Sequence, residues 1–347
     1  MYVQTVLGRI LPEEMGFTLP HEHLFWDISF YLPNDLRPED LNDPRNQPIR
    51  MDMLGKLHYH LTDYRDNLVS KEVEAVLREL QWFKESGGGT ICECSVPGMG
   101  GDPVKVREVS RQSGIHIVKG TGAYCSYTLP EELNRLNQDQ MAERFIKEIT
   151  TGIDDTGIQC GFIGEIGINE GLEDGDRRTL AAAAIASRKT GASILIHQPG
   201  LEHRADEIFR IITDNGGSLE RVVMCHCDPL LPDHDYIDHM AKSGAFISFD
   251  FFGLEIVLNL KGYRNLWLPT DHERIIAIRE QINRGNLKHI VMSHDTVYKS
   301  MWRQYGGFGY AHLPENILPL MRAEGYEENW ITQMTVHNPR EIFSMKE

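Results

Sequence analysis

The stretch "DRRTLAAAAIASRKTGASILIHQPG", residues 176–200, joins the two patterns that decide the fold. Residues 176–190 form a helix-like segment, and Gly191 suits the residue that ends a helix. The apolar run "ASILIHQPG", residues 192–200, is typical of a strand. Strands that alternate with helices in this way predict β-α-β units and a parallel sheet.

Similar apolar runs recur along the whole chain. They cover residues 16–24, 89–96, 115–124, 160–168, 192–200, 221–227, 245–253 and 288–296. Helix-like segments lie between most of them, for example "KEVEAVLRELQWFKESGGG" at 71–89 and "QMAERFIKEIT" at 140–150. Eight such units in about 300 residues predict a closed (β/α)8 TIM barrel, an α/β fold of this typical size.

The domain organisation follows from the same pattern. Without a sequence repeat or a linker-like change in composition, residues 1–347 are predicted to form a single barrel domain. Residues from about 1 to 15 are expected to form a short N-terminal hairpin or a plug at the bottom of the barrel. Three long connections, 25–70, 251–270 and 296–313, would all lie at the mouth, where the active sites of such barrels are found.

Composition and charge narrow the class of protein. With 41% hydrophobic and 25% charged residues, the chain has the composition of a soluble globular protein. Its formal net charge of −16 argues against nucleic acid and anionic membranes as partners, because both require a basic face. The N-terminus does not resemble a signal peptide, and no run approaches the roughly 20 apolar residues of a membrane span. A cytoplasmic location is therefore expected.

The cysteines have two possible roles. The chain has six: Cys92, Cys94, Cys125, Cys160, Cys225 and Cys227. The two C-x-C pairs leave a structural zinc site as an alternative, although zinc-binding pairs are usually spaced C-x-x-C. Since all six lie in apolar, strand-like runs, we expect buried free thiols.

The first strand carries the pattern "TLPHEHL", with His21 and His23 on either side of one glutamate. On a strand, alternate side chains point to the same face, so both imidazoles would converge on one point. Neutral imidazole is the commonest metal ligand among protein side chains. A second pair, His58 and His60, has no strand-like context, and we expect it to be solvated.

Polar residues also interrupt other predicted strands near their C-terminal ends. The full set is His21, His23, Glu165, His197, His226 and Asp295. Any single one could be a hydrogen-bonded polar group of the core, because burying a charge is costly unless it is paired or bound to a metal. Four imidazoles and two carboxylates at the same end of one barrel suit two divalent ions a few Å apart.

Several stretches together resemble the phosphotriesterase family of the amidohydrolase superfamily. They are "TLPHEHL", "GGGTICECSVPGMGGD", "IVKGTGAY", "ILIHQPG", the "SHD" at 293–295 and "VHNPREIF", and the resemblance covers nearly the whole chain. It implies a TIM barrel of the metal-dependent hydrolase type with a binuclear metal centre.

The resemblance also implies how the ligands divide between the two metals. His21, His23 and Asp295 would hold the more buried ion, and His197 and His226 the more exposed one. Glu165 and a hydroxide would bridge both ions. Zinc is the first expectation for both, with manganese, cobalt or iron as alternatives. Many family members use a carboxylated lysine as the bridge. With the shorter Glu165, either the metals would lie closer to its strand or the strand would have to move inward.

The reaction expected from this centre is hydrolysis. The bridging hydroxide would attack a lactone or a carboxylate ester, with Asp295 taking its proton. Tyr124 matches a tyrosine that points at the metals in lactonase-like members, and it is the second predicted catalytic residue. His294 should point away from the site. Two alternatives are a phosphotriesterase with the same centre and a catalytically idle, metal-containing binding barrel.

Substrate contacts are expected from Tyr124, Phe251, Tyr298 and Trp302. Phe251 stands where relatives often carry histidine or arginine, which disfavours a strongly anionic substrate. The aromatic loop "TVYKSMWRQYGGFGYAH", residues 296–312, suits an apolar lid over a small-molecule site or a contact in a homodimer. Asp228 and Asp250 are expected to orient metal ligands.

Overall fold

Eight parallel strands form the central sheet of the protein. The computed structural model describes residues 1–260 and 263–346. The strand order is β14-β11-β10-β9-β8-β7-β6-β3. In chain order these are β3 (Phe17–Glu22), β6 (Gly88–Glu93), β7 (His116–Ala123), β8 (Phe162–Gly167), β9 (Ile194–His197), β10 (Val222–Cys225), β11 (Phe246–Phe249) and β14 (Ile290–Met292). Each predicted apolar run contains a whole strand of this sheet or nearly all of one. The predicted (β/α)8 barrel is confirmed.

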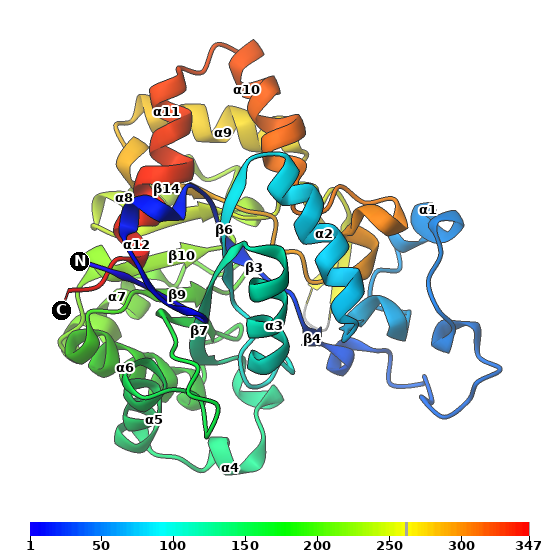
Figure 1. Ribbon diagram of the computed structural model, residues 1–347, viewed down its shortest axis with the longest axis horizontal. Helices are drawn as coiled ribbons and strands as arrows, with labels where there is room; N and C mark the ends of the chain where they lie inside the picture. The colour runs from blue at the N-terminus through cyan, green and yellow to red at the C-terminus, as the bar shows by residue number, and fades with distance from the viewer. Residues whose placement is uncertain (261–262, 347) are drawn as a thin grey trace.

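Helices surround the sheet (Figure 1). They are α2 (Val73–Glu85), α3 (Pro103–Ser113), α5 (Gln138–Thr150), α6 (Asp174–Thr190), α7 (Ala205–Asp214), α8 (His234–Lys242) and α9 (Asp271–Asn283), followed by α10 (Leu318–Ala323), α11 (Glu328–Thr332) and α12 (Asn338–Phe343). Helix α6 ends at Gly191, which has a φ of 77° and donates its N–H to the carbonyl of Ser187. Glycine reaches this left-handed conformation without steric cost, so the predicted helix end is confirmed.

The barrel closes between its first and last strands. The N–H of His21, on β3, donates to Ser293 Oγ at 3.2 Å, just beyond β14. The N–H of Asp295 in turn donates to the carbonyl of His21 at 3.3 Å. The two ends of the sheet are therefore joined at the C-terminal ends of the strands, where the predicted metal ligands lie.

The N-terminal segment fills the opposite end of the barrel. Strands β1 (Val3–Thr5) and β2 (Gly8–Ile10) form an antiparallel hairpin. Val3 and Met15 are fully buried in one cluster with Phe162 of β8 and Phe343 of α12. The segment is thus a hairpin and a plug at once. All six cysteines are buried free thiols, as expected, and three of them, Cys92, Cys94 and Cys225, belong to the same interior cluster.

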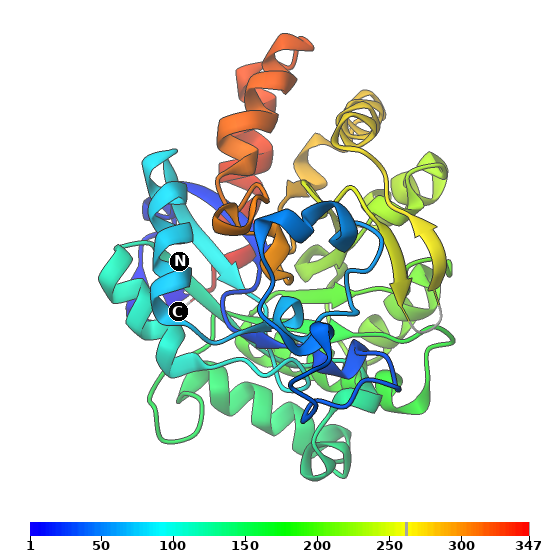
Figure 2. The same ribbon diagram turned by 90° about the vertical axis from the view of Figure 1, so that its right-hand side faces the viewer.

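Long connections build the mouth. In Figure 1 both termini lie on the left, whereas β4 (Trp26–Asp27) and α1 (Leu54–Leu57) lie on the right. Figure 2 faces that side, with segment 25–70 in blue in front and the hairpin of β12 (Val257–Leu260) and β13 (Tyr263–Trp267) in yellow. Across the described part of the chain, no helix is long and apolar enough to cross a membrane.

The loop 296–313 is anchored to segment 25–70. Lys299 Nζ lies 2.7 Å from Asp66 Oδ1, and the N–H of Ser300 donates to Asn67 Oδ1 at 2.8 Å. The ring of Trp302 meets that of Trp26 edge-on, with 5.3 Å between centroids. These contacts make the first half of the loop a packed support for segment 25–70. The two roles expected for the loop, an apolar lid or a contact in a homodimer, stay predictions.

Candidate metal centre

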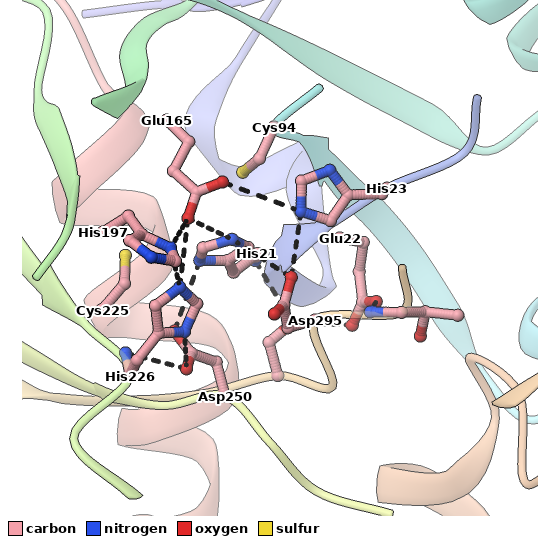
Figure 3. A network of polar contacts seen from close by, with 12 residues as sticks. His21, Glu22, His23, Cys94, Glu165, His197, Cys225, His226, Asp250 and Asp295 are labelled. Atoms are coloured by element: carbon pink, nitrogen blue, oxygen red, sulfur yellow. Dashed lines mark hydrogen bonds and ion pairs between the residues drawn. The ribbon is translucent and has the colours of Figure 1, made fainter. Parts of the chain in front are cut away.

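The six predicted ligands converge at the C-terminal ends of five strands. Figure 3 shows their side chains pointing toward one another. His21 lies on β3 with His23 just beyond its end, Glu165 lies on β8, and His197 ends β9. His226 and Asp295 follow β10 and β14. Because parallel strands end at the same edge of the barrel, residues more than 270 positions apart in the chain share one site.

Glu165 is the centre of this group. Its Oε1 lies 2.9 Å from His197 Nδ1, 3.0 Å from His226 Nε2 and 3.6 Å from His21 Nε2. Its Oε2 faces His23 Nε2 at 3.9 Å. One carboxylate therefore faces all four imidazoles, which is the geometry a bridging ligand requires.

Among the described residues the ligand atoms form three groups: two clusters that meet at Glu165 contain the six predicted ligands, and the third joins His21 and His226 to Asp250. His21, His23 and Asp295 form one, with Asp295 Oδ1 2.9 Å from His23 Nε2 and 3.5 Å from His21 Nε2. Glu165, His197 and His226 form the other. Within each cluster the ligand atoms lie within 4.8 Å of one another. This division is the one that the family resemblance implies.

The imidazole nitrogens of the site are suited to bind divalent cations. His21 Nε2 and His23 Nε2 are buried without a hydrogen-bond partner. His226 Nε2 and His197 Nδ1 lie 2.8 Å apart, so a proton or a cation must separate the two nitrogens. Buried imidazole nitrogens left without a donor or acceptor are costly unless a metal takes their lone pairs.

The electrostatics of the site also favour cations. Burial would lower the pKa of His21, but Glu165, Asp250 and Asp295 outweigh burial and raise this pKa to about 9. The surplus of negative charge that holds a proton on His21 would equally attract a divalent cation in its place.

Asp250 orients two of the imidazoles. It follows β11, and its Oδ1 accepts hydrogen bonds from the backbone N–H of His226 and from His226 Nδ1, both at 2.9 Å. Its Oδ2 lies 3.3 Å from His21 Nδ1. Both rings are thereby turned so that Nε2 faces Glu165. Asp228 contacts Asp250 on the side away from the imidazoles. Its Oδ2 accepts the N–H of Asp250 at 3.0 Å, and its Oδ1 accepts from Arg274 Nε at 2.6 Å.

Sequence reasoning missed the residue that orients His23. Ser95, two residues after β6, places its Oγ 2.9 Å from His23 Nδ1. A serine in "CECSVPG" carries no motif of its own, but its position just after a strand at the mouth could have identified it. The pair His58 and His60 is exposed, as expected, and lies outside the centre.

A small cavity of about 70 Å³ opens above the centre. Its lining is His23, Ile28, Tyr31, Met99, Tyr124, Glu165, His197, Phe251, Leu254, Leu258, Asp295, Val297 and Tyr298. Of the predicted substrate contacts, Tyr124, Phe251 and Tyr298 are included. Trp302 is not: its side chain is fully buried against Trp26, so the structure does not support its predicted substrate-binding role.

Two aromatic rings pack directly on two of the predicted metal ligands. The ring of Tyr124 meets His197 edge-on at 5.1 Å, and the ring of Phe251 stacks on His226 at 4.7 Å. Tyr31, from segment 25–70, was not predicted, and its hydroxyl lies 3.2 Å from that of Tyr124. Among the described residues that line the cavity, none is lysine or arginine.

Comparison with known proteins identifies the family. The phosphotriesterase family matches residues 1–343 of the chain. The chain belongs to the phosphotriesterase family. With its paired His/Asp and His/Glu clusters, it is a hydrolase of this family with a two-metal type of site.

Similar members span the full length of the chain. The N-acetyltaurine hydrolases of Rattus norvegicus and Homo sapiens are 34% and 32% identical, and each alignment covers 99% of this chain and 98% of the relative. A resiniferatoxin-binding protein from Rhodobacter sphaeroides has a TM-score of 0.92 at 31% identity, covering 99% of this chain and 95% of that one. The phosphotriesterase homology protein of Escherichia coli, solved with phosphate in its active site, has a TM-score of 0.77 at 26% identity, covering 95% and 99%.

Proposed function

We propose that this protein hydrolyses the acyl bond of a small molecule, with an N-acyl amide as the first substrate class and a lactone or carboxylate ester as the second. The observation that carries the proposal is the position of Asp295. Its side chain is 13% exposed to the cavity, whereas those of Glu165 and Asp250 are 2% and 0% exposed. It is therefore the carboxylate of the centre best placed to exchange a proton with substrate.

The two ligand clusters would hold two divalent cations, with zinc as the first ion to test and manganese, cobalt and iron as alternatives. When bound, such ions polarise a carbonyl oxygen and lower the pKa of water. Asp295 would accept the proton of the attacking water and pass it to the leaving nitrogen or oxygen. His23, 2.9 Å from Asp295 Oδ1, limits the rotation of this carboxylate.

Tyr124 would act as a hydrogen-bond donor. Burial raises the pKa of its hydroxyl well above the ordinary value, so the phenol keeps its proton at neutral pH. Its ring packs against His197 at the cavity wall. From there it can donate to a substrate oxygen that gains negative charge, which stabilises the transition state.

Two observations rank the substrates. Relatives named N-acetyltaurine hydrolases match this chain over 99% of its length at 32–34% identity, which supports cleavage of an amide. The apolar side chains of Ile28, Met99, Leu254 and Val297, with no lysine or arginine among the described lining residues, support an uncharged acyl group in the cavity. This second observation keeps lactones and esters in consideration.

A substrate panel tests the proposal. Metal-loaded protein would be assayed with N-acetyltaurine, N-acetyl amino acids, lactones, aryl esters and phosphotriesters, beside Asp295→Asn. We expect an acyl substrate to be turned over fastest and the variant to lose roughly 10²–10⁴-fold in kcat. Faster turnover of a phosphotriester than of any acyl compound would favour the phosphotriesterase alternative. Equal activity in the variant would rule out the role of Asp295.

A further inference from the structure

Glu22, the middle residue of the H-E-H pattern, has no part in the two ligand clusters. It is fully buried on β3, and the two-residue period of a strand turns it away from the face that carries His21 and His23. A buried carboxylate is costly unless it is paired or hydrogen-bonded, so its partners show what holds it there.

Among the described residues, its side chain accepts four hydrogen bonds, all from one turn of the chain, residues 293–296. Oε1 accepts from Ser293 Oγ at 2.8 Å, from the N–H of His294 at 2.9 Å and from His294 Nδ1 at 2.7 Å. Oε2 accepts from the N–H of Thr296 at 3.0 Å. Figure 3 places Glu22 beside Asp295, on the side away from Glu165.

The same turn carries Asp295. Its φ of 49° is in the left-handed region, which residues other than glycine adopt infrequently. The two backbone N–H groups that Glu22 binds, those of His294 and Thr296, flank Asp295 on both sides. Glu22 therefore fixes the backbone on either side of the residue whose conformation is unusual.

The contact also joins the first and last strands of the barrel, where β3 meets the segment after β14; this junction is called the seam below. Strands β3 and β14 stand at opposite ends of the strand order. Ser293 Oγ donates to Glu22 and accepts from the N–H of His21, so one hydroxyl joins both strands. The ligands on the two sides of this seam are those of one cluster, His21 and His23 on one side and Asp295 on the other.

We propose that Glu22 is a positioning residue of the metal centre, which sets Asp295 against His21 and His23 across the seam and so forms this cluster before metal binds. The inference rests on the two-metal site of the proposed function and on no substrate. If the unchanged protein binds two metals but hydrolyses no acyl compound, the proposed function is refuted and the role of Glu22 is not.

The test is Glu22→Gln, measured by metal binding. Glutamine keeps the shape but replaces one acceptor with a donor, so at least one N–H of the turn loses its partner. We expect the affinity for one metal of the two to fall roughly 10- to 100-fold, as when other residues that orient ligands are changed. Metal content after dialysis against a buffered chelator would fall toward one ion per chain. The absorption spectrum of the cobalt-loaded protein would lose the contribution of one site.

Glu79→Gln is the matched control. Glu79 of α2 is also a buried glutamate that accepts two backbone N–H groups from the loop after β14, those of Arg303 at 3.1 Å and Gln304 at 3.2 Å. It belongs to neither ligand cluster. We expect this variant to bind both metals with unchanged affinity, which separates loss of a buried carboxylate in general from loss of Glu22.

Ser293→Ala serves if Glu22→Gln does not fold. It removes one donor to Glu22 and the acceptor of the His21 N–H, and it leaves the two backbone hydrogen bonds from the turn to Glu22. A loss of affinity at the same site is expected. Circular dichroism of the metal-free proteins checks the fold. Two tightly bound metals and an unchanged cobalt spectrum in the folded variants would overturn the proposal, as would an equal loss in Glu79→Gln.

Discussion

The hydroxyl oxygens of Tyr31 and Tyr124 lie 3.2 Å apart in the wall of the cavity. Tyr31 comes from segment 25–70, and Tyr124 follows β7. Burial is the main reason why the pKa of each hydroxyl lies well above its ordinary value, so both remain protonated. One hydroxyl can donate to the other, which leaves one proton of the pair for the substrate.

This pair predicts a graded loss of activity. Tyr124→Phe should lower kcat about 10- to 100-fold with little change in KM, because its hydroxyl acts mainly on the transition state. Tyr31→Phe removes only the partner and should lower kcat about 3- to 10-fold, the equivalent of one ordinary hydrogen bond. Tyr59→Phe, at a residue that is 55% exposed, is the control and should change neither constant. A larger loss in Tyr31→Phe than in Tyr124→Phe would reverse the assigned roles.

If Glu165 bridges the two metals, metal binding should not require carbon dioxide. A carboxylated lysine must react with carbon dioxide before it can bridge two metals, whereas Glu165 carries its carboxylate permanently. Metal-free protein reloaded in degassed buffer should therefore take up two ions, as it would with added bicarbonate. Metal content by mass spectrometry is the readout, and Glu165→Gln, which should retain at most one ion, is the control. A requirement for bicarbonate would contradict the bridge.

The contact between Lys299 and Asp66 predicts a stability change. The side chain of Lys299 is 4% exposed. Among the described residues, Asp66→Asn would leave this buried ammonium with one carboxylate partner, Glu72, which is 3.4 Å away and 60% exposed. Asp66 Oδ2 also accepts the N–H of Ile49 at 2.9 Å, and the variant can lose this bond as well. We expect the free energy of unfolding to fall by roughly 2–4 kcal/mol, measured by urea titration. Asp52→Asn breaks the exposed pair with Arg50 in the same segment and should leave stability unchanged. Equal effects of the two variants would show that segment 25–70 is not anchored by Lys299.

Glu79 predicts a dependence of stability on pH. Burial raises the pKa of its carboxyl to about 7, although the N–H groups of Arg303 and Gln304 oppose the shift. Because this pKa is higher in the folded than in the unfolded chain, the folded state binds more protons. The contribution of Glu79 to stability is thus complete below about pH 4.5 and is lost as the pH rises through about 7.

The measurement is the difference in free energy of unfolding between Glu79→Gln and the unchanged protein at several pH values. Other titrating groups largely cancel in this difference. As the pH rises from 5 to 8, the free energy of unfolding of the variant should increase relative to that of the unchanged protein, by at most roughly 3 kcal/mol. A flat difference across this range would show that Glu79 titrates normally in the fold.

The barrel and the convergence of the six predicted ligands could be predicted because each depends on a local pattern. Every strand of the barrel lies in an apolar run, and every ligand interrupts such a run near its end. Parallel strands then bring these ends together without further information. Asp250 could be placed near the centre for the same reason, but its contact with two imidazoles depends on the twist of the barrel.

Residues outside the strands could not be predicted in this way. Tyr31 reaches the cavity because contacts such as Lys299 with Asp66, 233 positions away, fold segment 25–70 over the mouth. No local pattern encodes such contacts. Trp302 was expected at the substrate site because its loop is aromatic, yet the same hydrophobicity buries it against Trp26. Glu22 carries no signal in the sequence, since a glutamate between two histidines also suits a solvated strand face.

We propose that two divalent ions, held by the two clusters that meet at Glu165, make this protein a hydrolase of acyl bonds. The most direct measurement is a titration of zinc into metal-free protein, followed by the rate of hydrolysis of the best acyl substrate from the panel. We expect negligible activity without metal and a rate that reaches its plateau at two ions per chain. Activity that is independent of added metal, or full activity at one ion per chain, would contradict it.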